Sequence, residues 1–98
     1  MKINIDEKLL KKIVSFLKEY PEIKRAVIFG SRVRGDSSYN SDIDIAIDAE
    51  SELPTSFFLD MDEIAGLYKV DILIMKKISD ENLKNEIEKY GVEIYKAG

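Results

Sequence analysis

The feature that most constrains the fold of this sequence is the stretch from Asp42 to Asp48, in which isoleucine alternates with other residues. The odd-numbered positions hold Ile43, Ile45 and Ile47, and the even-numbered positions hold Asp42, Asp44, Ala46 and Asp48. Successive side chains of a β-strand point to opposite faces. The alternation therefore predicts a strand with one buried face and one face that carries carboxylates.

The segments around this strand alternate between helical and strand patterns. Helices are predicted over residues 4–20, with Asn4 and Glu7 as a capping box, over 57–68 after Pro54, and from the cap Ser79 to Tyr90, with Gly91 at C′. Further strands are predicted over 25–29, 70–75 and 92–95, and the nearly all-apolar run 70–75 is expected at the centre of the sheet. These elements predict an α/β (α+β) fold, a mixed sheet of three to four strands flanked by helices, in a single domain over residues 1–98.

The composition limits the chemistry. The chain has no cysteine and no histidine, which excludes disulfides, thiolate zinc sites and histidine acid–base catalysis. Lys and Arg number 15 against 19 Asp and Glu, a net charge of −4 that argues against general nucleic-acid binding. No apolar run is long enough for a signal peptide or a membrane span, so a cytoplasmic protein is expected.

The first candidate site is Gly30-Ser31, directly after the predicted strand 25–29. A glycine there lets the backbone approach a ligand closely, and Ser31 can offer its hydroxyl and its amide to a phosphate. Arg32 and Arg34 can neutralise further phosphate charge. A plain turn with solvated arginines explains the same residues.

The second candidate is the pair Asp42 and Asp44. Residues two apart on a strand point the same way, with Cα atoms about 6.6 Å apart at a rise of about 3.3 Å per residue. Two adjacent carboxylates repel each other unless a cation neutralises them, and aspartate is disfavoured in strands. A metal site is therefore favoured over the solvated face of an edge strand.

The third candidate is Asp71, the one charged residue in the run 70–75. A capping or turn role is possible, since Lys69 precedes it. Otherwise a buried carboxylate needs a partner, and a metal held by Asp42 and Asp44 would supply one. Carboxylate ligands without histidine or thiolate suit a hard cation such as Mg²⁺, with Mn²⁺ as a substitute.

The ordered combination is more specific than its parts. Gly30-Ser31-Arg32-Val33-Arg34-Gly35 followed by Ser41-Asp42-Ile43-Asp44 resembles the signature of the DNA polymerase β-type nucleotidyltransferase superfamily. More closely, it resembles the minimal nucleotidyltransferase (MNT) family, and the order of elements extends the likeness to nearly the whole chain.

The resemblance implies a nucleotidyltransferase fold and a role for each matching residue. Gly30 and Ser31 would hold the nucleoside triphosphate, with Arg32 and Arg34 as further phosphate contacts. Asp42 and Asp44 would bind two Mg²⁺ ions. Asp71 would ligate the catalytic ion and could take the proton of the attacking hydroxyl. ATP is the expected substrate.

The resemblance also implies a partner. MNT proteins are typically antitoxins that adenylylate a tyrosine of a HEPN-type ribonuclease toxin. Two alternatives remain open: an antitoxin that sequesters its toxin without chemistry, and an enzyme that nucleotidylates a small molecule or an RNA end. Three converging carboxylates weigh against the first alternative, and the acidic net charge weighs against the second.

Overall fold

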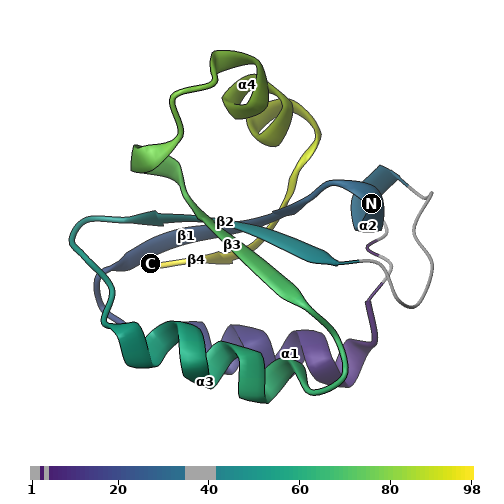
Figure 1. Ribbon diagram of the computed structural model, residues 1–98, viewed down its shortest axis with the longest axis vertical. Coiled ribbons are helices and arrows are strands. Elements are labelled where there is room, and N and C mark those ends of the chain that lie inside the picture. The colour runs from purple at the N-terminus through teal and green to yellow at the C-terminus, as the bar shows by residue number, and fades with distance from the viewer. Residues whose placement is uncertain (1–2, 4, 35–41) are drawn as a thin grey trace.

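The computed structural model describes residues 3, 5–34 and 42–98, which form a four-stranded sheet with helices on both faces (Figure 1). The helical elements are α1 (Glu7–Leu17), α2 (Ser31–Arg34), α3 (Thr55–Ala65), the 3-10 turn η1 (Met75–Lys77) and α4 (Glu81–Tyr90). The strands are β1 (Ile23–Phe29), β2 (Ile43–Ala49), β3 (Val70–Ile74) and β4 (Val92–Lys96). The predicted α/β class and mixed sheet are confirmed.

The strand order across the sheet is β3-β2-β1-β4. β1 pairs antiparallel with β2 on one side and with β4 on the other, whereas β2 and β3 run parallel. Parallel neighbours need a crossover connection, and α3 supplies it. The starts of β2 and β3 therefore lie at the same end of the sheet as the end of β1.

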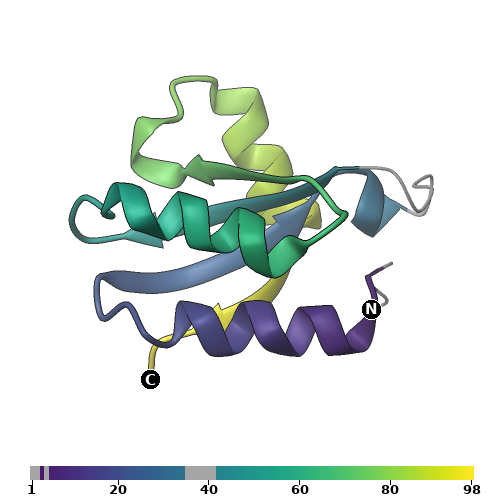
Figure 2. The same ribbon diagram turned by 60° about the horizontal axis from the view of Figure 1, so that its bottom comes forward.

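The two faces of the sheet have separate apolar clusters. α1 and α3 pack on one face, where the buried side chains include Leu9, Ile13, Leu17, Ile43, Ile45, Ile47, Phe57 and Met61. On the other face, α4 contributes Ile87 to a smaller cluster with Val27, Phe29 and Ala46. Figure 2 shows α1 and α3 side by side across the first face. The acidic residues of β2 therefore lie on the α4 face.

The register of β2 follows from this division. Full burial of one isoleucine side chain stabilises the fold by about 1.5–3 kcal/mol, and β2 buries three of them. A shift of one residue would move these isoleucines to the α4 face and turn the aspartates into the larger core. The alternation thus fixes which face carries the carboxylates.

α1 is shorter than expected. The sequence predicted a helix over 4–20, but α1 begins at Glu7, after an N-cap at Asp6 whose side chain makes no capping hydrogen bond. Asn4, the expected capping residue, lies outside the described residues. The helix ends at Leu17, before Pro21, and the ring of Phe16 stacks on that of Phe57 in α3 at 5.3 Å.

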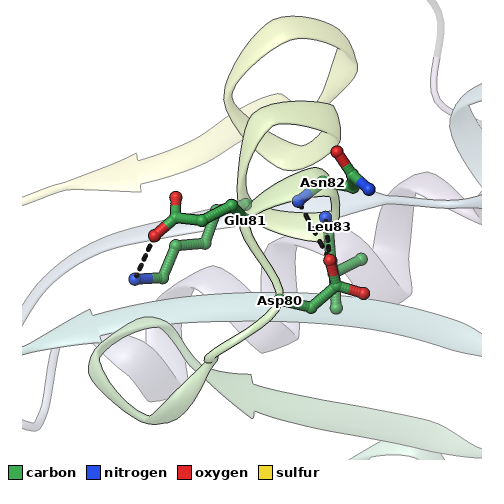
Figure 3. A network of polar contacts seen from close by, with 5 residues as sticks. Asp80, Glu81, Asn82 and Leu83 are labelled. Atoms are coloured by element: carbon green, nitrogen blue, oxygen red, sulfur yellow. Dashed lines mark hydrogen bonds and ion pairs between the residues drawn. The ribbon is translucent and has the colours of Figure 1, made fainter.

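α4 begins one residue later than expected. Ser79 was predicted as its cap, but the Asp80 carboxylate accepts hydrogen bonds from the backbone N–H groups of Asn82 (2.9 Å) and Leu83 (3.3 Å), as Figure 3 shows. Aspartate caps a helix as well as serine does, and its charge suits the positive end of the helix dipole.

Gly91 was predicted at C′ of α4, where glycine usually takes the left-handed conformation, but its φ is −66°. Gly91 is required for space: a Cβ there would lie 2.3 Å from Val27 Cγ1 and 2.4 Å from the Ile87 carbonyl oxygen. The glycine lets the chain pass close over β1 into β4.

β3 is an edge strand, although its apolar run was expected at the centre of the sheet. Ile72 and Ile74 pack against the larger cluster, and Leu73 packs against the smaller one. Helices on both faces therefore explain the apolar run without a second neighbouring strand. Within the described ranges, no helix is long and apolar enough to cross a membrane.

Candidate functional site

The site is built at the end of the sheet where β1 stops and β2 and β3 begin (Figure 1). Gly30 follows β1 with φ +81°, in the left-handed region that favours glycine. Its carbonyl oxygen accepts a hydrogen bond of 3.0 Å from Val33 N–H, which starts the turn of α2. Ser31 and Arg34 belong to α2, but their side chains, with Gly35 and Ser41, lie outside the described part of the chain.

Gly30 lies directly against Asp44. A Cβ placed on Gly30 would be 2.6 Å from the Asp44 carboxylate oxygen Oδ2. Contact this close is possible only for glycine, so the turn after β1 and a carboxylate of β2 occupy one small space. A ligand bound at the Gly30 backbone would touch Asp44.

The parallel pairing of β2 and β3 brings two predicted site residues together. Asp44 is the register partner of Asp71, next to the pair Ile43 and Val70. Asp42 immediately precedes β2, and the Asp71 carboxyl group, when protonated, donates a hydrogen bond to the Asp42 side chain. The amide N–H of Ile43, between Asp42 and Asp44, donates to the carbonyl oxygen of Lys69 at 2.8 Å, which ties the connection before β3 to the start of β2.

The electrostatics of Asp71 reflect this crowding. Burial raises the pKa of the Asp71 carboxyl, and its hydrogen bond with Asp42 and the charges of Asp42 and Asp62 raise it further. Lys69 opposes them, with Nζ 4.0 Å from Asp71 Oδ1. The fold thus holds Asp71 beside negative groups, with the exposed Lys69 as a compensating charge, and a bound cation would be stabilised in this setting.

The donor set fits a hard divalent cation, because it consists of carboxylates in a chain without histidine or cysteine. Asp42 and Asp71 are in contact, and Asp44 is the neighbour of Asp71 across the strand pair. As the side chains stand, no three acidic groups of the described residues are gathered around one point. The backbone positions suit a metal, whereas the carboxylates must turn to share it.

An Asp71→Asn variant is expected to melt at a slightly higher temperature than the wild type at pH 7 without metal. A raised carboxyl pKa means that folding disfavours the ionised form, so the penalty is present above the folded pKa and absent at pH below the ordinary aspartate value of about 3.9. Because the side chain is 44% exposed, we expect a rise of only about 1–3 °C.

Melting curves at pH 7 and at pH 3.5 would check this result, since the difference between variant and wild type should vanish at the lower pH. A lower melting temperature for the variant at pH 7 would mean that the ion pair with Lys69 outweighs the unfavourable contacts.

Arg32 lies in a different setting from the one expected of a phosphate contact. Its side chain is only 3% exposed, and Cζ lies 5.3 Å from the ring centroid of Tyr68. Tyr68 was read from the sequence only as part of a helix face, although it lies in the connection between α3 and β3. The influence of the Asp62 charge on Asp71 was also missed, because no local pattern indicates that a residue of α3 acts across that connection.

Two hollows lie away from these residues. One, of about 200 Å³, is lined by residues 49–53 with Ile74, Lys76 and Lys77, at the opposite ends of β2 and β3. The other, of about 370 Å³, lies between α1 and α3 beside Phe16 and Ile64. The carboxylates of Asp42, Asp44 and Asp71 line neither hollow.

Comparison with known proteins gives consistent results. The sequence profile of a family described as "Polymerase beta, Nucleotidyltransferase" matches residues 11–97. Two proteins of Methanocaldococcus jannaschii, each named "Putative protein adenylyltransferase", are similar to this chain. One is 36% identical over 99 residues, covering 94% of this chain and 97% of the relative. The other is 33% identical over 88 residues, covering 84% and 87%.

A solved structure shares the fold. It contains a tri-AMPylated HEPN toxin of Shewanella oneidensis in complex with an MNT antitoxin. The likeness has a TM-score of 0.68 at 22% identity, and it covers 95% of this chain and 74% of the matched chain. At that identity the comparison supports the architecture of sheet and helices described above.

Proposed function

This chain belongs to the polymerase beta nucleotidyltransferase family, and from that premise we propose that it transfers AMP from ATP to a hydroxyl group of a partner protein. The observation that carries the proposal is the meeting of Gly30, Asp44 and Asp71 at one end of the sheet. Both relatives in Methanocaldococcus jannaschii bear names that give protein as the acceptor and adenylyl as the transferred group.

Gly30 and Ser31 would hold the triphosphate, since the glycine backbone is open to close approach beside Asp44. Asp42, Asp44 and Asp71 would hold Mg²⁺, two ions in the full assignment, and their carboxylate chemistry fits that ion. Bound magnesium would offset the negative charge of the phosphates during transfer. Arg34 is the further phosphate contact in this proposal, because Arg32 is buried against Tyr68.

The acceptor would approach Asp71 from the edge of the sheet that β3 forms. β3 is an edge strand and the Asp71 side chain is 44% exposed, so a hydroxyl on a second protein can reach it. Asp71 would accept the proton of that hydroxyl while the hydroxyl oxygen forms a bond to the α-phosphorus of ATP. The bond from that phosphorus to the bridging oxygen breaks in line, and pyrophosphate leaves.

The acceptor we propose is a tyrosine of a HEPN-type toxin, with this chain as a cytoplasmic antitoxin acting as a single domain. The support is the shared fold with the MNT antitoxin whose HEPN partner is tri-AMPylated. Sequestration of the toxin without chemistry, and transfer to a small molecule or an RNA end, are the outcomes against which this proposal is tested.

The test is intact-mass spectrometry of the protein encoded next to this chain, co-expressed and then incubated with ATP and Mg²⁺. We expect a mass gain of one or more AMP units on that partner. The gain should be absent when EDTA replaces Mg²⁺ in the incubation. A stable complex without any mass gain would indicate sequestration. Labelled AMP that appears on RNA or on a small molecule instead would indicate the other acceptor class.

A further inference from the structure

Among the residues that the structure describes, Arg32 is the one charged residue with less than a tenth of its surface exposed. Transfer of a guanidinium from water to a protein interior is costly unless other groups compensate it. Its Cζ lies 5.3 Å from the centroid of the half-buried Tyr68 ring, within the distance of about 6 Å typical of a cation–π contact. A side chain in this setting is held in one position.

Arg32 and Tyr68 lie next to the ends of two different strands, β1 and β3, on either side of β2. Arg32 follows Ser31 in α2, at the end of β1, and Tyr68 lies three residues before Asp71, at the start of β3. β2 separates β1 from β3, so the contact crosses the end of β2. With neighbouring strands about 4.8 Å apart, the span is about 10 Å, which a long arginine side chain and a tyrosine ring can cover together.

The contact also lies on the far face of the sheet from the carboxylates. Tyr68 and Val33 pack against the larger core beneath α1 and α3, together with Ile43 and Ile45. Asp44 alternates with these isoleucines and so faces the other way. Arg32 would therefore reach a phosphate beside Asp44 only if its guanidinium moved away from the Tyr68 ring.

The Tyr68 end of the contact is fixed relative to the carboxylates. The amide N–H of Tyr68 donates to the Ala65 carbonyl oxygen at 3.2 Å, and the next carbonyl oxygen, that of Lys69, accepts from Ile43 at 2.8 Å. The backbone that carries the Tyr68 ring is thus tied both to the end of α3 and to the start of β2. Any group held against it is held relative to Asp44 and Asp71.

We propose that Arg32 is a positioning residue: through Tyr68 it sets the separation between the Gly30-Ser31 turn and the carboxylates of β2 and β3, without touching the nucleotide. The inference rests on the proposed function, because it takes this end of the sheet as the site of Mg²⁺ and ATP. Mg²⁺ held by Asp42, Asp44 and Asp71 would need the correct separation between these carboxylates and the turn at which ATP would bind, whereas ATP binding without Mg²⁺ would depend on it much less.

The test is a double-mutant cycle of Arg32→Met and Tyr68→Leu, read as the affinity for ATP with and without Mg²⁺. We expect each single variant to weaken ATP binding in Mg²⁺ about tenfold and to change it less than about twofold without Mg²⁺. The double variant should be no weaker than Arg32→Met, because residues that act through one contact are not additive. Melting curves of all variants would show that they are folded.

Two conservative variants separate positioning from direct binding. Tyr68→Phe keeps the ring and should bind Mg²⁺-ATP within about twofold of the wild type. Arg32→Lys keeps the charge but shortens the reach, so it should lose affinity like Arg32→Met. A phosphate ligand would tolerate the lysine far better, since lysine binds phosphate as a point charge.

Other outcomes would overturn the inference. If Arg32→Met weakens ATP equally with and without Mg²⁺, or if the two losses add, Arg32 contacts the nucleotide or acts independently of Tyr68. A wild-type chain that binds Mg²⁺-ATP but modifies no protein contradicts the proposed acceptor and leaves the cycle readable. A wild-type chain that does not bind Mg²⁺-ATP contradicts both proposals.

Discussion

Asp42→Asn and Asp44→Asn are each expected to lower AMP transfer at least about a hundredfold while the protein stays folded. Each change removes one negative oxygen from the proposed metal site, and the loss of metal-based charge stabilisation has effects of this size. The fold should tolerate Asp42→Asn well, because the Asp42 carboxylate raises the pKa of Asp71 and so opposes ionisation of its neighbour. The measurement is the rate of label transfer from ATP to the partner, with melting curves alongside.

Asp48→Asn is the matched control for these two variants. Asp48 lies on the same face of β2, at the far end of the strand, where its register partner is Arg25 rather than Asp71. It should retain transfer within about twofold, as expected of a surface change away from a site. Full activity in either Asp42→Asn or Asp44→Asn would remove the metal assignment.

Gly30→Ala is the second change with a large expected effect. A Cβ at φ +81° costs about 1–3 kcal/mol, and it would also meet Asp44 Oδ2 at 2.6 Å. That contact can be relieved only if the backbone moves or the Asp44 carboxylate turns away, and either movement disrupts the site. We expect a melting temperature several degrees lower and a loss of transfer of about a hundredfold or more.

Gly66→Ala separates the two causes. Gly66 has φ +64°, but a Cβ there would meet nothing within 4 Å. The variant should show a similar loss of stability and keep most of its transfer activity. If instead it lost as much activity as Gly30→Ala, backbone strain rather than close approach to Asp44 would explain the effect.

Much of this arrangement could be predicted from the sequence because the evidence for it is local. The alternation over residues 42–48 predicted β2 and its carboxylate face, and the structure confirms both. The prediction that β3 lies at the centre of the sheet was wrong for a physical reason. An apolar run reports burial of both faces of a strand, and helices can bury both faces of an edge strand as well as those of a central one.

The setting of Arg32 could not be predicted, because its contact lies 36 positions further along the chain, at Tyr68. Sequence patterns report neighbours within a turn or a strand, and an arginine beside a glycine-serine turn looks the same whether it faces a phosphate or a ring. Asp44 and Asp71 are also far apart in the sequence, but the order of the strands made their pairing a reasonable prediction. The roles of these residues remain predictions for the experiments above.

The antiparallel path of β4 has a practical consequence for those experiments. Arg25 pairs with Lys96, and the amide N–H of Ala97 donates to the Lys24 carbonyl oxygen, so the last residues lie at the end of β1 remote from Gly30. α1, in contrast, starts at the end of the sheet where α2 lies (Figures 1 and 2). An affinity tag or dye attached at the C-terminus therefore leaves the approach to Asp71 open.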